Sequence, residues 1–359
     1  MNICSLRNQE LNNFIKLYII VTAILLYITP FTQPEANILY SNGLFITDIV
    51  AKSFDAIFHI HWFIRLPFYL ISLLNILLIK KVASIYIKDN TYVNLAVFLY
   101  LITPGVFVSF ILVNYATIAI FLSLTFIYSY YNKSLLLEIM VFVLLIFTNT
   151  ASWVFYLAIA IFAYTKKDKR LTALSVMFLI IAIIVGAYPI DGVPKGHFMQ
   201  VLGIYGATLS PFYFLAFIYA IYRLGISGQR SLLWYITTTF FILSLLLSIR
   251  QKIRVTDFTP FIVIASILVV IVYKNSISIR LKVFHKNYKR VCQIVVAVLL
   301  LETSIAALSY PLYLVFKDNF TIIDTSMYKI AEHSNIKCLK TINKRDKKLY
   351  YYYGIKECR

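Results

Sequence analysis

Charge is scarce in this chain of 359 residues. Only 14% of the residues are charged and 15 are acidic, whereas 61% are hydrophobic and the mean hydropathy is +0.81. A soluble globular domain carries about 25% charged residues. The composition therefore excludes an ordinary soluble protein and places the chain in a lipid bilayer.

Several chemical motifs are missing as well. The chain has no Gly-rich phosphate loop, no HExxH sequence and no cysteine or histidine spacing typical of a metal site. We therefore expect no soluble nucleotide-binding unit, no metal and no other cofactor. The first apolar run lacks a small-residue cleavage site, and further runs follow it, so we do not expect a removable signal peptide.

Long apolar runs are what the chain has instead. A bilayer core of about 30 Å is crossed by about 20 apolar residues, and in lipid a helix satisfies its own backbone. We predict an all-α membrane bundle with eleven spans, near residues 14–31, 62–79, 91–104, 115–131, 135–149, 151–165, 171–188, 199–222, 231–249, 258–273 and 291–316.

The distribution of Lys and Arg predicts the orientation of these spans. With a cytoplasmic N-terminus, the inner gaps hold eighteen basic residues and the outer gaps six, as the positive-inside rule requires. Joining 135–165 into one span reverses the downstream gaps and gives ten inside against fourteen outside. We expect a transmembrane domain at 1–316 in the inner (plasma) membrane and a small extracytoplasmic tail domain at 317–359, although the tail's ten basic residues oppose its export.

The four cysteines divide between the two predicted sides. Cys4 and Cys292 fall on the reducing cytoplasmic side, whereas Cys338 and Cys358 both fall in the tail. In an oxidising compartment the tail pair would close a disulfide with nineteen residues between them. Two unpaired thiols in a small domain are the alternative.

The first outer loop, 32–61, contains the acids Glu35, Asp48 and Asp55. Its apolar residues recur at helical spacing, which predicts a helix lying in the membrane interface. Partial burial there would raise the pKa of a carboxyl group and suit it to accept a proton from a bound hydroxyl. We take Glu35 and Asp48 as candidate bases; an ordinary solvated acid is the alternative at each position.

Basic residues on the predicted outer side are candidates for binding phosphate. Arg65 opens the second span, where it either reaches the surface or pairs with a loop acid or a lipid phosphate. Arg250, Lys252 and Arg254 precede Asp257 and break the positive-inside pattern. Guanidinium and ammonium groups at a membrane surface suit phosphate or pyrophosphate; ion pairing with Asp257 or Glu35 is the alternative.

Lys195 and His197 lie in an outer Gly- and Pro-containing loop and are weaker candidates. Glu302 lies near the middle of the last span, where acids are commonly functional; a hydrogen bond to Ser or Tyr on a neighbouring helix is the alternative. The basic blocks at 166–170 and 274–290 are most simply topology determinants beside anionic headgroups, so the net charge of +19 does not indicate a nucleic-acid partner.

The order of these features resembles the polytopic glycosyltransferases of the GT-C fold that use lipid-linked sugars, in the branch of the aminoarabinose and protein O-mannosyl transferases. The resemblance covers roughly residues 10–275. It is carried by PEANILYS (34–41), RLPFYLISLL (65–74), ITPGVFVSFILVNYATIAI (102–120), the helix pair at 135–165 and RQKIRVTDFTPFI (250–262).

This resemblance implies a mechanism. In the family the first-loop acid is the base, which points to Glu35, although Pro34 stands where a second acid is common and Asn114 stands where another acid is usual. A polyprenyl-phosphate sugar would be the donor, and a glycolipid or glycan the acceptor. Arg65 and the 250–254 cluster would stabilise the departing lipid phosphate.

Other classes remain open from the sequence. A surface-polysaccharide polymerase or ligase would also use outer basic loops. A polysaccharide or lipid transporter would need polar residues through its spans, and Glu302 is nearly the only central charge. A non-catalytic membrane subunit is the remaining alternative.

Overall fold

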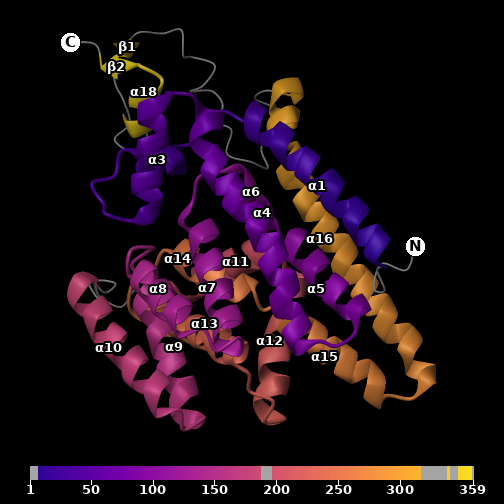
Figure 1. The fold of residues 1–359 in the computed structure, drawn as a ribbon. Helices are drawn as coiled ribbons and strands as arrows, with labels where there is room; N and C mark the ends of the chain where they lie inside the picture. Colours follow the sequence, from indigo (N-terminus) through magenta and orange to yellow (C-terminus); the bar gives the residue numbers. More distant parts are fainter. Residues whose placement is uncertain (1–6, 187–195, 317–337, 340–346, 358–359) are drawn as a thin grey trace.

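The computed structural model describes residues 7–186, 196–316, 338–339 and 347–357, and in these ranges the chain is almost entirely helical (Figure 1). The first seven helices are α1 (Asn8–Ile28), α2 (Gln33–Leu39), α3 (Ile46–Ile57), α4 (His61–Tyr86), α5 (Asn90–Leu101), α6 (Pro104–Ile111) and α7 (Tyr115–Tyr131). The next are α8 (Leu135–Ile146), α9 (Ser152–Thr165), α10 (Lys169–Gly186), α11 (Phe198–Leu209), α12 (Pro211–Ile226), α13 (Leu232–Arg250), α14 (Val255–Val263), α15 (Ser266–Ile279) and α16 (Lys282–Phe316).

The C-terminal part adds a small element to one end of the bundle. Strands β1 (Cys338–Leu339) and β2 (Lys356–Glu357) pair in parallel, and α18 (Lys347–Tyr352) lies between them in the sequence. Figure 1 places these elements beside α3, at the end of the molecule opposite the α12–α13 connection. Because α18 packs on α2, the described tail and the first loop share one end of the bundle.

Five helices are long and apolar enough to cross a membrane, and the number rises to eight if three bent pairs each count as one span. Every predicted span has a helical counterpart, but α7, α8 and α9 are shorter than a span. The membrane character of the chain is thereby supported, whereas the count of eleven stays a prediction. The 135–165 segment forms two helices, α8 and α9, as we expected from the charge distribution.

The three bent pairs are a feature that the predicted straight spans missed. α5 and α6 meet at 65°, α11 and α12 at 105°, and α14 and α15 at 43°. Pro104 and Pro211 occupy the first positions of α6 and α12. A proline there donates no backbone hydrogen bond and disfavours helix in the residue before it, so the preceding helix ends and a new one starts. The predicted 199–222 span is therefore two helices with a sharp corner.

The core lies where the central helices cross. α4 packs against α5 and α7, and α9 packs against α10 and α13. Aromatic rings fill the neighbouring contacts: Phe240 of α13 stacks on Phe261 of α14 with centroids 3.8 Å apart, and Phe126 of α7 stacks on Phe142 of α8 at 4.9 Å. By contrast, α1 and α10 expose rows of Ile, Leu and Val, which fits a surface that faces lipid.

The cysteines differ in part from the prediction. Cys292 is disulfide-bonded, which does not fit its assignment to a reducing cytoplasmic side. It lies ten residues into α16, where its side chain is half-buried against the core. The predicted Cys338–Cys358 bridge lies outside the described side chains.

Candidate functional site

Glu35 and Arg65 form a buried ion pair at the end of the bundle that carries α3 and α18. Arg65 Nε donates to Glu35 Oε1 at 2.7 Å, and Arg65 Nη2 donates to Oε2 at 2.6 Å. Arg65 is 1% exposed and Glu35 is 0% exposed. This two-pronged geometry is the strongest form of a carboxylate–guanidinium contact.

Three further donors complete the surroundings of Glu35. The backbone N–H and hydroxyl of Thr32 donate to Oε2 at 2.9 and 2.8 Å, and the backbone N–H of Val113 donates to Oε1 at 3.0 Å. Thr32 and Glu35 thereby form a capping box at the start of α2. A carboxylate offers about four lone-pair positions, so five donors leave none for a substrate hydroxyl.

Arg65 is equally occupied on its other edge. Its Nη1 donates to the carbonyl oxygens of Leu26 and Thr29, at 3.0 and 2.7 Å, and its Nη2 donates to the Pro30 carbonyl at 2.8 Å. These carbonyls end α1, where a cation is favoured by the helix dipole. We predicted that Arg65 either reaches the surface or pairs with a loop acid or a lipid phosphate. In the structure it pairs with a loop acid, Glu35.

The tail covers this ion pair. The ring of Tyr352 stacks on Phe31 with centroids 4.1 Å apart, and the Tyr353 hydroxyl donates to the Phe31 carbonyl at 3.2 Å. Burial raises the pKa of Tyr353 to about 12. Burial also raises the pKa of Tyr40, at the end of α2, to about 12, and Asp55 adds to that rise. Tyr40 and Tyr353 are therefore neutral while α18 is packed against α2 and Phe31.

Asp48 has a different environment from Glu35. It lies in the first turn of α3, is 0% exposed, and accepts one hydrogen bond on Oδ1 from the Tyr115 hydroxyl at 2.9 Å. Its Oδ2 is buried and has no hydrogen-bond partner among the described residues. A methyl group built on Gly43 would lie 2.5 Å from Oδ2, so only glycine leaves room there for the carboxylate.

Asp257 and Arg254 lie near the Asp48–Tyr115 pair. Tyr115 is within electrostatic range of Asp48, Asp257 and Arg254. Asp257, in the first turn of α14, accepts a hydrogen bond from Thr150 at 3.1 Å. We call Asp48, Tyr115, Thr150, Arg254 and Asp257 the outer acid cluster.

Three packed elements hold the outer acid cluster together. The backbone N–H of Ile46 donates to the Phe147 carbonyl at 2.8 Å, which ties the start of α3 to the α8–α9 connection. Asn149 in that connection donates to the backbone carbonyl of Asp257 at 3.0 Å. Residues far apart in the sequence are thereby fixed around one buried carboxylate.

The remaining predicted basic residues lie at the edge of this cluster. Arg250 ends α13, Arg254 occupies the N-cap position of α14, and Lys252 lies between them. All three side chains are exposed. Arg65 is not part of this group, because it is buried against Glu35.

Other predicted residues have structural surroundings or lie outside the described ranges. Asn114 caps α7: its Oδ1 accepts from the Thr117 backbone at 3.0 Å and its Nδ2 donates to the Leu112 carbonyl at 2.9 Å. His197 is half-buried at the N-cap position of α11, and among the described residues it forms no hydrogen bond with the outer acid cluster. Lys195 lies outside the described residues.

Glu302 lies on α16, near the corner between α11 and α12. Its carboxylate faces the hydroxyl of Ser210 at that corner, and its Oε2 is buried. Ser210 has φ of 73°, in the left-handed region that is unfavourable for serine. This region is separate from the outer acid cluster.

Sequence reasoning missed Tyr115, Thr150 and Gly43. Tyr115 lies within one of the motifs quoted above, and it follows a capping asparagine, but nothing local in the sequence pairs it with residue 48. The described residues contain no group of three or more His, Cys, Asp or Glu side chains placed to hold a metal ion. The outer acid cluster itself holds two acids, Asp48 and Asp257, with hydroxyl groups from Tyr115 and Thr150.

Comparison with known proteins adds no relative: no family model, no characterised protein and no solved structure matches the chain.

Proposed function

We propose that the protein is a membrane glycosyltransferase that moves a sugar from a polyprenyl-phosphate donor to a glycolipid or glycan acceptor at the outer face of the inner membrane. The N-terminus lies in the cytoplasm and the tail outside. The observation that carries the proposal is Asp48, a buried carboxylate oriented on one oxygen and without a partner on the other.

Asp48 is the base in this proposal. A general base needs an oxygen within hydrogen-bond reach of the substrate proton and a second group that fixes its orientation. The Tyr115 contact to Oδ1 meets the second need. Oδ2 is buried and has no partner among the described residues, so in this proposal it is the oxygen that accepts the proton once a substrate displaces the groups that cover it. Glu35 accepts hydrogen bonds from five donors, so we assign it to holding the first loop together.

The reaction conserves protons and charge through the named groups. The acceptor oxygen attacks the anomeric carbon of the donor while its proton passes to Asp48, and the bond from that carbon to the phosphate oxygen breaks. The leaving polyprenyl phosphate gains negative charge, which Arg254 and the exposed Arg250 and Lys252 are placed to stabilise.

A transporter is the second candidate, because three span-like helix pairs are broken and Glu302 places a carboxylate with a buried oxygen inside a span-like helix. Broken helices near the bilayer midplane build ion and substrate sites in transporters. The two functions differ in the residue they need. Transport predicts that Glu302→Gln is severe and Asp48→Asn mild, and the transferase predicts the reverse.

Lipid analysis of a deletion strain tests the proposal. We expect mass spectrometry to find a polyprenyl-phosphate sugar accumulated and a glycolipid or glycan lacking that sugar, with both changes reversed by the wild-type gene. A lipid extract identical to that of the parent strain would overturn the transferase proposal.

A further inference from the structure

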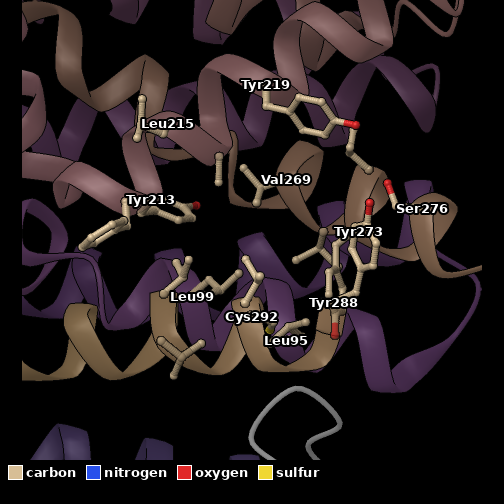
Figure 2. Close-up of a pocket in the computed structure, with 17 residues that line it drawn as sticks. Leu95, Leu99, Tyr213, Leu215, Tyr219, Val269, Tyr273, Ser276, Tyr288 and Cys292 are labelled. Carbon is tan, nitrogen blue, oxygen red and sulfur yellow. The ribbon is translucent and has the colours of Figure 1, made fainter. Parts of the chain in front are cut away.

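A groove opens between α5, α12, α15 and α16, and none of its lining residues belongs to the outer acid cluster. Its volume is about 420 Å³, and it is lined almost entirely by apolar side chains, among them Leu95, Leu99, Val269 and Val296 (Figure 2). This volume lies in the range of pockets that hold small ligands, about 300–1,000 Å³.

The groove continues into a second cavity with polar walls. This cavity of about 370 Å³ shares Tyr219, Val272 and Ser276 with the groove. Its lining includes Arg223 and Arg280 but no Asp or Glu. The two cavities therefore form one space with an apolar interior and a positively charged mouth.

The two arginines are placed to receive an anion. Arg223 lies in the last turn of α12 and forms no ion pair with a described residue. Arg280, just after α15, lies over the ring of Tyr288, with 4.5 Å between the guanidinium carbon and the ring centroid. This stacking fixes the guanidinium plane and leaves its N–H groups for another partner.

The deep end of the groove carries a hydroxyl that lacks a partner. Tyr213 is 2% exposed, its Oη forms no hydrogen bond with a described residue, and Figure 2 shows it pointing into the cavity. A buried hydroxyl left without a hydrogen bond destabilises the fold. An occupant that brings a polar atom or an unsaturated bond to this end would relieve that loss.

The length of the space matches one leaflet of a bilayer. Tyr213 and Arg223 lie ten residues apart on α12, which is about 15 Å along the helix. This is about half of the 30 Å hydrocarbon core. An amphiphile with its headgroup at the mouth would therefore reach the midplane with its chain.

We propose that this groove binds one anionic glycerophospholipid, with its phosphate between Arg223 and Arg280 and one acyl chain in the apolar cavity. Both arginines belong to the gaps that the charge distribution assigns to the cytoplasm, where anionic lipids are enriched. The site is independent of the proposed transferase reaction, because it shares no residue with the outer acid cluster.

Native mass spectrometry of the purified chain in detergent tests the site. We add palmitoyl-oleoyl phosphatidylglycerol, phosphatidylcholine with the same chains, or glycerol phosphate without chains. We expect one phosphatidylglycerol bound about tenfold more tightly than phosphatidylcholine, because the choline ammonium of phosphatidylcholine offsets the phosphate charge and is repelled by the two arginines. Equal affinity for the two lipids, or tight binding of glycerol phosphate alone, would overturn the proposal.

Variants then separate the mouth from the groove. Arg223→Ala with Arg280→Ala should abolish the preference for phosphatidylglycerol, and Val269→Trp should block chain entry while both arginines remain. Lys166→Ala with Lys169→Ala removes two exposed charges elsewhere and is the matched control. A double arginine variant that keeps the full preference would contradict the site, as would a control variant that loses it equally.

Discussion

Replacing Glu35 with glutamine tests whether this acid holds the structure or performs chemistry. Whichever way the new amide is turned, its NH2 group meets two N–H donors: Arg65 Nη2 and the Thr32 backbone on one side, or Arg65 Nε and the Val113 backbone on the other. The substitution therefore leaves a buried guanidinium without its counter-charge and adds repulsion between donors.

The magnitude follows from the burial of the pair. Removing one partner of a buried ion pair destabilises a fold by about 3–5 kcal/mol. We expect Glu35→Gln to lower the free energy of unfolding by that amount, measured by titration with SDS in mixed micelles. Transfer per folded molecule should fall much less than the yield of folded protein.

Glu10→Gln is the matched control, because Glu10 occupies the same third position of a capping box at the start of α1. It accepts one hydrogen bond, from the Arg7 backbone at 3.0 Å, at an exposed site. We expect a change below about 1 kcal/mol, since glutamine also serves in a capping box. A stable Glu35→Gln protein that has lost transfer would refute the structural role and restore Glu35 as the base.

Three further predictions follow from other parts of the chain. Gly43→Ala should lower turnover on the order of a hundredfold by displacing Asp48 Oδ2. Gly203→Ala is the control and should leave turnover unchanged, because its added methyl group meets nothing within 4 Å. Equal turnover in the two variants would contradict the close packing of Gly43 against Asp48. Cysteines placed at residues 41 and 168 should react with impermeant reagents from opposite sides of intact membranes, and labelling from one side only would exclude the topology. The pKa of Tyr40 and of Tyr353 is raised from 10.0 to about 12 in the folded protein, so docking of α18 should be fully stable below pH 10 and weaken as pH rises through 12. Protease sensitivity of the tail that stays constant as the pH rises from 10 to 12 would contradict this.

The sequence was sufficient to predict the membrane bundle but not its corners. Hydropathy and the Lys and Arg residues between the apolar runs located the helical segments, because both signals depend on local composition. The bend between α11 and α12 depends on Pro211 together with the unfavourable φ of Ser210. An apolar window of the usual length averages across such a break.

The site was predicted less completely, for a physical reason. Glu35 and Asp48 look alike in sequence, since both are acids of the same predicted outer loop, 32–61. The two acids differ in their hydrogen bonds, which come from residues distant in the sequence. Arg65 and Val113 donate to Glu35, whereas Tyr115 donates to only one oxygen of Asp48 and the other has no partner among the described residues. Such long-range contacts are set by helix packing, and no local pattern encodes them.

The most direct test of the central claim is the turnover of purified Asp48→Asn in lipid nanodiscs. The substrate is the polyprenyl-phosphate sugar that accumulates in the deletion strain, supplied with membranes of that strain as acceptor. Asp55→Asn, a neutral replacement of an acid on the same helix, is the control. We predict that Asp48→Asn loses transfer by about 10²–10⁴-fold while Asp55→Asn keeps it, and full transfer by Asp48→Asn would contradict the account.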